Sequence, residues 1–63
     1  MKRKELKRIA EKIAKNEKII QNGKDMKQKM EAEANIMKLS EQLENIEDIL
    51  KVDELVQEIL KKN

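Results

Sequence analysis

Residues 19–28 read IIQNGKDMKQ, and they hold the clearest signal for how the chain folds. Asn22 and Gly23 are the residue types that tolerate the left-handed backbone of a helix C-terminal cap. Soon after them, Asp25 can cap the start of another helix, with Gln28 three positions later completing a capping box. The stretch therefore predicts that one helix ends here, the chain reverses, and a second helix begins.

The sequence before this reversal predicts an amphipathic helix over about residues 2–21. Apolar residues recur there on a heptad seam, which Ala10 widens, at Leu6, Ile9, Ile13 and Ile20. Asn16 occupies the one gap in the seam. A buried asparagine there can fix register by pairing with its symmetry mate or a backbone group, whereas at the rim it is only a polar residue, and both interpretations stay open.

Beyond the reversal the apolar residues lie on two faces and then change direction. At about 100° per residue, one face holds Ala32, Ile36, Leu39, Leu43, Ile46 and Leu50. A second face holds Met26, Met30, Ala34 and Met37. A third direction holds Val52, Val56 and Ile59, widened by Leu55 and Leu60. The pattern slips near residues 44–50, where Asn45 can cap a new helix.

Two all-α architectures fit this pattern, both within a single helical domain spanning residues 1–63. In one, helices near 2–21, 24–44 and 46–61 form a small bundle, and the middle helix uses its two faces for its two neighbours. In the other, residues 24–62 form one helix about 58 Å long, which the first helix covers over about half its length. We favour three helices because the capping signal and the phase slip coincide.

The composition excludes most catalytic and cofactor chemistry. The 63 residues include no His, Cys or aromatic residue, and 44 % of them are charged. Disulfides, thiolate or imidazole metal sites, Cys or His nucleophiles and aromatic platforms for single-stranded nucleic acid are therefore excluded. Four carboxylates at helical spacing read as a solvated acidic face: Glu41, Glu44, Glu47 and Asp48. We expect no enzymatic activity, no cofactor and no bound metal.

The small size predicts that a partner completes the core. A chain of this length buries only about 60 % of the surface that its unfolded form exposes, and no aromatic residue adds a large buried area. We therefore expect a homo-oligomer, in its simplest form a dimer. The methionines fit a gap-filling core, including an oligomer core, more readily than an adaptable docking face. The residues expected at the oligomer or partner interface are Leu6, Ile9, Ile13, Asn16, Ile20, Met26, Met30, Met37, Leu55, Val56, Ile59 and Leu60.

Charge is distributed unevenly along the chain. Residues 1–30 hold 11 Lys and Arg against 4 Asp and Glu, a net +7, whereas residues 31–63 hold 4 against 9, a net −5. Opposite charges favour antiparallel pairing of the first segment with later sequence, within one chain or between copies. The outer face of the first helix carries a basic ridge that could bind a polyanion: Lys4, Lys7, Arg8, Lys12, Lys15 and Lys18. Because the chain has few arginines and no aromatic residues, a solubilising role for this ridge is favoured over nucleic-acid binding.

The length and the helix, Asn-Gly, helix start resemble the helical-hairpin class of small plasmid RNA modulators, which dimerise into four-helix bundles. The likeness is one of architecture, and no site residue is carried over from it. The size and the Lys, Ile and Asn content also suit a small accessory protein of a phage or mobile element.

These patterns together predict a non-catalytic interaction protein that self-associates and regulates, inhibits or scaffolds a larger protein. The alternative is a small RNA- or DNA-binding regulator that uses the basic ridge. No apolar run approaches the roughly 20 residues of a membrane span, and the charged start is unlike a signal peptide. We therefore expect a soluble cytoplasmic protein without membrane contact.

Overall fold

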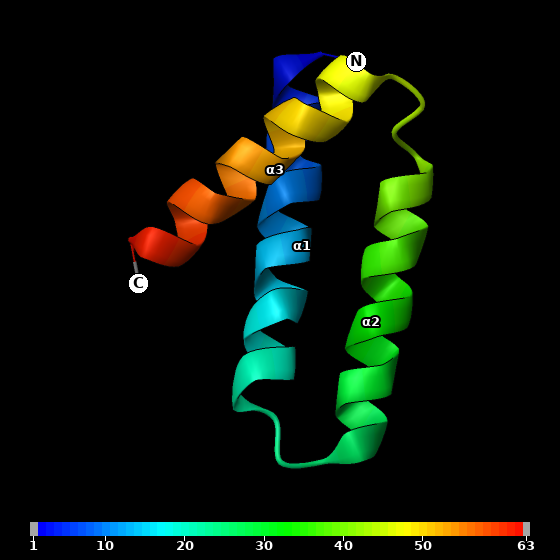
Figure 1. Ribbon diagram of the computed structural model, residues 1–63, viewed down its shortest axis with the longest axis vertical. Helices are drawn as coiled ribbons and strands as arrows, with labels where there is room; N and C mark the ends of the chain where they lie inside the picture. The colour runs from blue at the N-terminus through cyan, green and yellow to red at the C-terminus, as the bar shows by residue number, and fades with distance from the viewer. Residues whose placement is uncertain (1, 63) are drawn as a thin grey trace.

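The computed structural model describes residues 2–62, which form three helices joined by short connections (Figure 1). The helices are α1 (Arg3–Asn22), α2 (Met26–Glu41) and α3 (Ile46–Lys61), and no strand occurs among the described residues. The all-α, three-helix expectation is confirmed. The single long helix over 24–62 is wrong, because the chain leaves helical geometry at residues 42–45. The second helix ends three residues earlier than predicted.

Side-chain caps explain where α2 and α3 begin. Asp25 accepts a hydrogen bond from the backbone N–H of Lys27 at 3.0 Å, and Asn45 accepts one from that of Glu47 at 3.0 Å. Each bond satisfies an amide at the helix start that has no partner within the helix. Asp48 in the first turn of α3 and Lys61 in its last turn have the signs that the helix dipole favours. Asp25 and Asn45 are thus confirmed as N-caps, although Asp25 accepts from Lys27 and not from Gln28 as a capping box requires.

The cap of α3 gives a first stability prediction. Asn45→Ala should lower the free energy of unfolding by about 1 kcal/mol, because the amide of Glu47 loses its acceptor. Asn45→Ser is the matched control, since serine also caps helices and should retain most of the stability. Urea unfolding followed by circular dichroism measures both variants. Equal stability of all three proteins would show that the cap contributes nothing.

Gly23 ends α1 with a different backbone from the one predicted. Its φ is −68° and its ψ is 134°, and no described residue has a positive φ, so the expected left-handed cap is wrong. The N–H of Gly23 donates to the carbonyl oxygen of Ile19 at 2.7 Å. A Cβ at position 23 would collide with that same oxygen. Glycine is therefore needed here for close approach, while the chain leaves the helix in an extended conformation.

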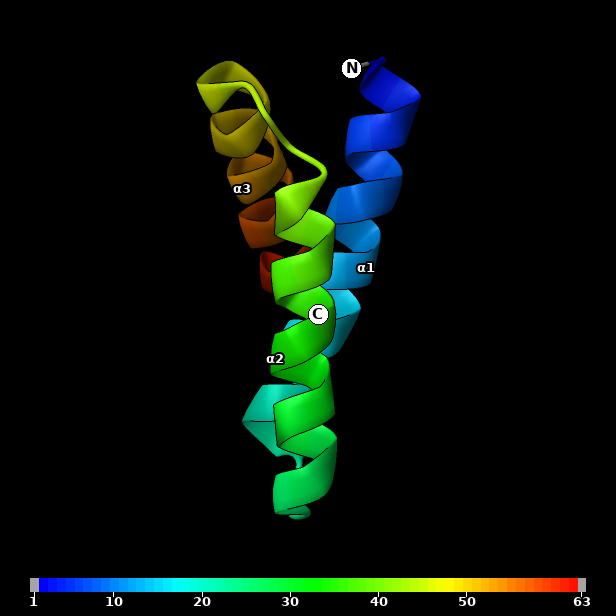
Figure 2. The same cartoon turned by 90° about the vertical axis from the view of Figure 1, so that its right-hand side faces the viewer.

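The first helix is the centre of the fold. α1 contacts both other helices, whereas α2 and α3 barely contact each other. α2 runs antiparallel to α1, and α3 crosses α1 obliquely on a different side (Figures 1 and 2). The expectation that the middle helix contacts both neighbours is therefore wrong. The physical reason is the width of the apolar stripe on α1, where Ala10 and Ala14, at 0 % and 1 % exposure, extend the buried surface beyond the heptad seam.

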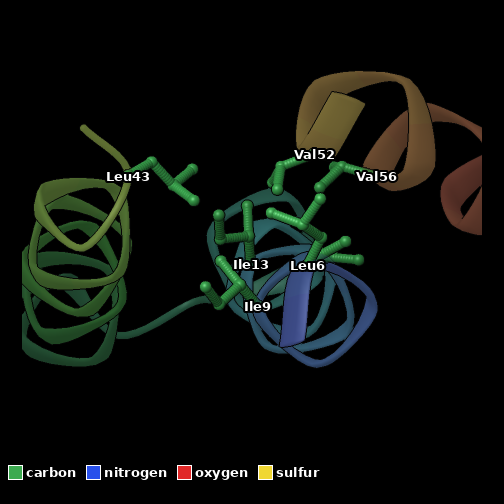
Figure 3. Close-up of a cluster of buried hydrophobic side chains, with 8 residues drawn as sticks. Leu6, Ile9, Ile13, Leu43, Val52 and Val56 are labelled. Atoms are coloured by element: carbon green, nitrogen blue, oxygen red, sulfur yellow. The ribbon is translucent and has the colours of Figure 1, made fainter. Parts of the chain in front are cut away.

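The hydrophobic core follows this stripe (Figure 3). Its buried members are Leu6, Ile9, Ala10, Ile13 and Ala14 of α1, Leu43 of the connection, and Val52 and Val56 of α3. Partly buried residues packed against them are Ile36 and Leu39 of α2 and Leu55, Ile59 and Leu60 of α3. No large side chain among the described residues is less than 2 % exposed. The core of a single chain is therefore shallow.

Candidate docking surface

The two helices that pack on α1 leave an apolar groove between them. The groove has a volume of about 250 Å³, and Ile13 lies at its floor between Leu43 on one side and Val52 on the other (Figure 3). Ile36 and Ile49 add further apolar lining. Polar side chains also line it, at Glu17, Ser40, Asp53 and Gln57. A closed three-helix bundle would fill this space with contacts between its second and third helices.

A stripe of exposed methionines runs along α2 beside the groove. The Met stripe consists of Met26, Met30 and Met37, which are 72 %, 64 % and 66 % exposed. At 100° per residue the three side chains fall within about 40° of one another. At the same rotation per residue, Ser40 lies between the stripe and Ile36 on the groove wall. Among the described residues of α2, Ala32 is the only one that is buried. The Met stripe is thus an apolar face that nothing in the described chain covers.

The start of α3 adds a second exposed apolar segment, whose exposure was not predicted from the sequence. Ile46, Ile49 and Leu50 are all exposed. Ile46 and Leu50 would lie on the same face as the buried residues of α2 only if one continuous helix ran through both segments. Because the chain breaks at residues 42–45, α3 turns Val52 and Val56 toward the core and leaves these three outside. The phase slip near residues 44–50 was the signal that could have revealed them.

The structure divides the predicted interface residues into three groups. Four are buried within the core of the chain itself: Leu6, Ile9, Ile13 and Val56. Five are half-buried: Asn16, Ile20, Leu55, Ile59 and Leu60. Three are exposed, namely the Met stripe. In this conformation α2 and α3 cover the side chains of the first group.

Asn16 makes its contacts within the chain. Its Nδ2 donates to the carbonyl oxygen of Lys12 at 2.8 Å, and its Oδ1 accepts a hydrogen bond from Nδ2 of Asn35 at 3.3 Å. The second bond joins α1 to α2 and helps to fix their register. Asn16 therefore pairs with a backbone group and with the neighbouring helix.

The basic ridge lies on the outer surface of α1. Lys4, Lys7, Arg8, Lys12 and Lys15 are exposed, and Lys18 is half-buried. The ridge is not one continuous trough. Lys12 and Lys15 line a hollow toward α2, whereas Lys4 and Lys7 line another toward α3. A nucleic acid backbone would therefore meet a convex helix surface with hollows on both sides.

The described part of the chain shows no built centre for chemistry. Across residues 2–62 no group of three or more acidic side chains could hold a metal ion, and no polar or charged side chain is buried. None of the three described helices combines the length and apolarity needed to cross a membrane.

No protein-family profile, curated protein or solved structure matches the chain. Its fold and surface define it as a small all-α protein with an open three-helix arrangement and an exposed apolar surface.

Proposed function

We propose that the protein is a non-catalytic interaction module that self-associates, in its simplest form as a dimer, and regulates, inhibits or scaffolds a larger protein. The Met stripe is the observation that carries this proposal. α2 exposes three large apolar side chains in one line, and exposed apolar patches of this kind mark interaction surfaces. Covering a methionine side chain stabilises a complex by about 1.5–3 kcal/mol relative to leaving it in water.

The shallow core supports the same proposal. Single domains of this size are marginally stable, and a second chain adds buried area that the chain cannot supply alone. Methionine side chains are flexible and polarizable, so they can adapt to the surface of a partner helix. The absence of cysteine is compatible with the reducing cytoplasm, where we place this module.

Thermal unfolding at different protein concentrations tests self-association. Because association stabilises only the folded chain, the melting temperature should rise by about 10 °C over a hundredfold increase in concentration. A triple variant with Met26→Gln, Met30→Gln and Met37→Gln should lose this dependence while remaining helical. A melting temperature that does not change with concentration in the unmodified protein would contradict the proposal.

A polyanion-binding role is the second candidate, favoured by the exposure of Lys4, Lys7, Arg8, Lys12 and Lys15 on one helix. We expect no appreciable affinity for RNA or DNA at physiological salt, since acidic residues of the same molecule repel phosphates. The comparison uses the unmodified protein and a variant in which Lys4, Arg8, Lys12 and Lys15 are replaced by Gln. Sub-micromolar binding that weakens steeply with salt and disappears in the variant would promote this second role.

A further inference from the structure

We infer that the occupant of the Met stripe is the α2 helix of a second copy, running antiparallel and related by a two-fold axis near residues 31–32. This inference rests on the proposed self-association and specifies its geometry. The argument uses the spacing of the stripe, the charges along α2 and the position of Glu33.

The Met stripe has the spacing of a helix-pairing seam. Met26, Met30, Glu33 and Met37 are separated by four, three and four residues, which is the heptad alternation of two packed helices. A two-fold axis near residues 31–32 places Met26 of one copy level with Met37 of the other. It also makes both copies use the same patch, so that the assembly closes as a dimer instead of growing into a filament.

Charge along α2 selects the antiparallel direction. Residues 26–30 hold Lys27 and Lys29 and no acidic residue, a net +2. Residues 31–41 hold Glu31, Glu33 and Glu41 against Lys38, a net −2. These side chains are exposed, apart from the half-buried Lys29. Antiparallel packing sets the basic half of each helix beside the acidic half of the other, whereas parallel packing sets like charges together.

The position of Glu33 also favours antiparallel over parallel packing of the two α2 helices. It lies within the stripe, between Met30 and Met37, and it is exposed. In a parallel dimer in register, Glu33 would meet Glu33 of the second copy directly, and two carboxylates would repel at the centre of the seam. In the antiparallel dimer Glu33 lies level with Met30 of the second copy, one position from the second copy's Lys29. Only the antiparallel arrangement gives this carboxylate a cation to pair with.

Disulfide trapping tests the geometry, because the chain has no native cysteine. One preparation carries Met26→Cys and is labelled with ¹⁵N, and the other carries Met37→Cys without label. Both positions are exposed, so neither substitution removes core packing. The two are mixed at equal concentration in a glutathione redox buffer, and the disulfides are identified by mass. We expect the mixed 26–37 disulfide to exceed each self-pair by about tenfold or more. Lys12→Cys on α1 is the control and should cross-link only at background level.

The other outcomes separate the inference from the proposed function. Dominant 26–26 and 37–37 disulfides would show parallel packing, and a dimer without cross-links above the Lys12→Cys control would place the interface elsewhere. Either result overturns the inference and leaves self-association intact. A chain that sediments as a monomer overturns both. If the stripe binds a different protein and the chain does not self-associate, the inference is wrong and that protein is the occupant of the stripe.

Charge exchange provides an independent test. Lys29 and Glu33 lie two residues either side of residue 31, so the two-fold axis near residues 31–32 places Lys29 of each copy beside Glu33 of the other. Lys29→Glu or Glu33→Lys alone should each weaken dimer formation by about tenfold, because each variant pairs like charges twice in its own antiparallel dimer. An equimolar mixture of the two variants should restore association at low salt, since both charge pairs are again opposite. Failure of the mixture to recover would contradict antiparallel pairing.

Discussion

Ile13→Ala is expected to lower the free energy of unfolding by about 2–5 kcal/mol. Ile13 is 8 % exposed and lies where α1, Leu43 and Val52 meet, so a smaller side chain leaves a cavity that neighbours on separate elements cannot easily fill (Figure 3). Whole domains are stable by only about 5–15 kcal/mol, which makes this a large fraction of the total.

Lys12→Ala is the matched control for this prediction. Lys12 is the preceding residue on the same helix, but its side chain is exposed on the outer face. Its replacement should change the free energy of unfolding by less than about 0.5 kcal/mol. Urea unfolding at a fixed protein concentration keeps any contribution from association equal in the two variants. Equal and small effects at both positions would show that the core does not lie on this face of α1.

Met30→Glu is expected to raise the dissociation constant of the proposed dimer by about a hundredfold or more. The substitution places a carboxylate at the centre of the Met stripe, where burial without a partner is costly. In the antiparallel arrangement it also sets this carboxylate level with Glu33 of the second copy. Because Met30 is 64 % exposed in the single chain, the variant should keep its helical content.

Sedimentation equilibrium measures the effect, with circular dichroism to verify that the helices persist. Lys15→Glu is the control, since it makes a larger charge change on the exposed face of α1. Its effect on association should be small. Unchanged association of Met30→Glu would place the interface away from the Met stripe, and equal weakening by both variants would indicate a nonspecific effect of charge.

The features predicted from the sequence are those that depend on neighbouring residues. The side chains of Asp25 and Asn45 cap the amides two positions further along, so local residue types suffice to place the starts of α2 and α3. Helical periodicity likewise places Ala32, Ile36 and Leu39 on the side of α2 that is partly or fully buried. These predictions needed no knowledge of which helix packs against which.

The features that were not predicted from the sequence depend on which of several apolar surfaces pack against each other. The two-faced pattern of α2 suggested contacts on both sides, but α3 packs on α1, because Ala10 and Ala14 widen its stripe enough to receive a second helix. Ala14, adjacent to the heptad seam and four residues after Ala10, was the available signal. The backbone of Gly23 was also mispredicted, since a glycine is equally suited to a left-handed cap and to close approach.

The exposed Met stripe was predicted only in part, because its exposure also depends on which helices pack against each other. The Met stripe was recognised as a second face of α2 and was predicted to be core, including an oligomer core, more often than a docking face, whereas the structure leaves it exposed. Whether that face meets another helix of the same chain depends on the path of α3, which periodicity alone does not determine. Leu6, Ile9 and Ile13 were predicted at an interface, and the structure places them in the core of the single chain.

The native mass of the unmodified protein tests the central claim, that the chain self-associates through its exposed apolar face. Sedimentation equilibrium over low to high micromolar concentrations should show a shift from the 7.5 kDa of one chain to twice that mass. The shift should disappear in the Met30→Glu variant. A single 7.5 kDa species throughout the high micromolar range would contradict the claim.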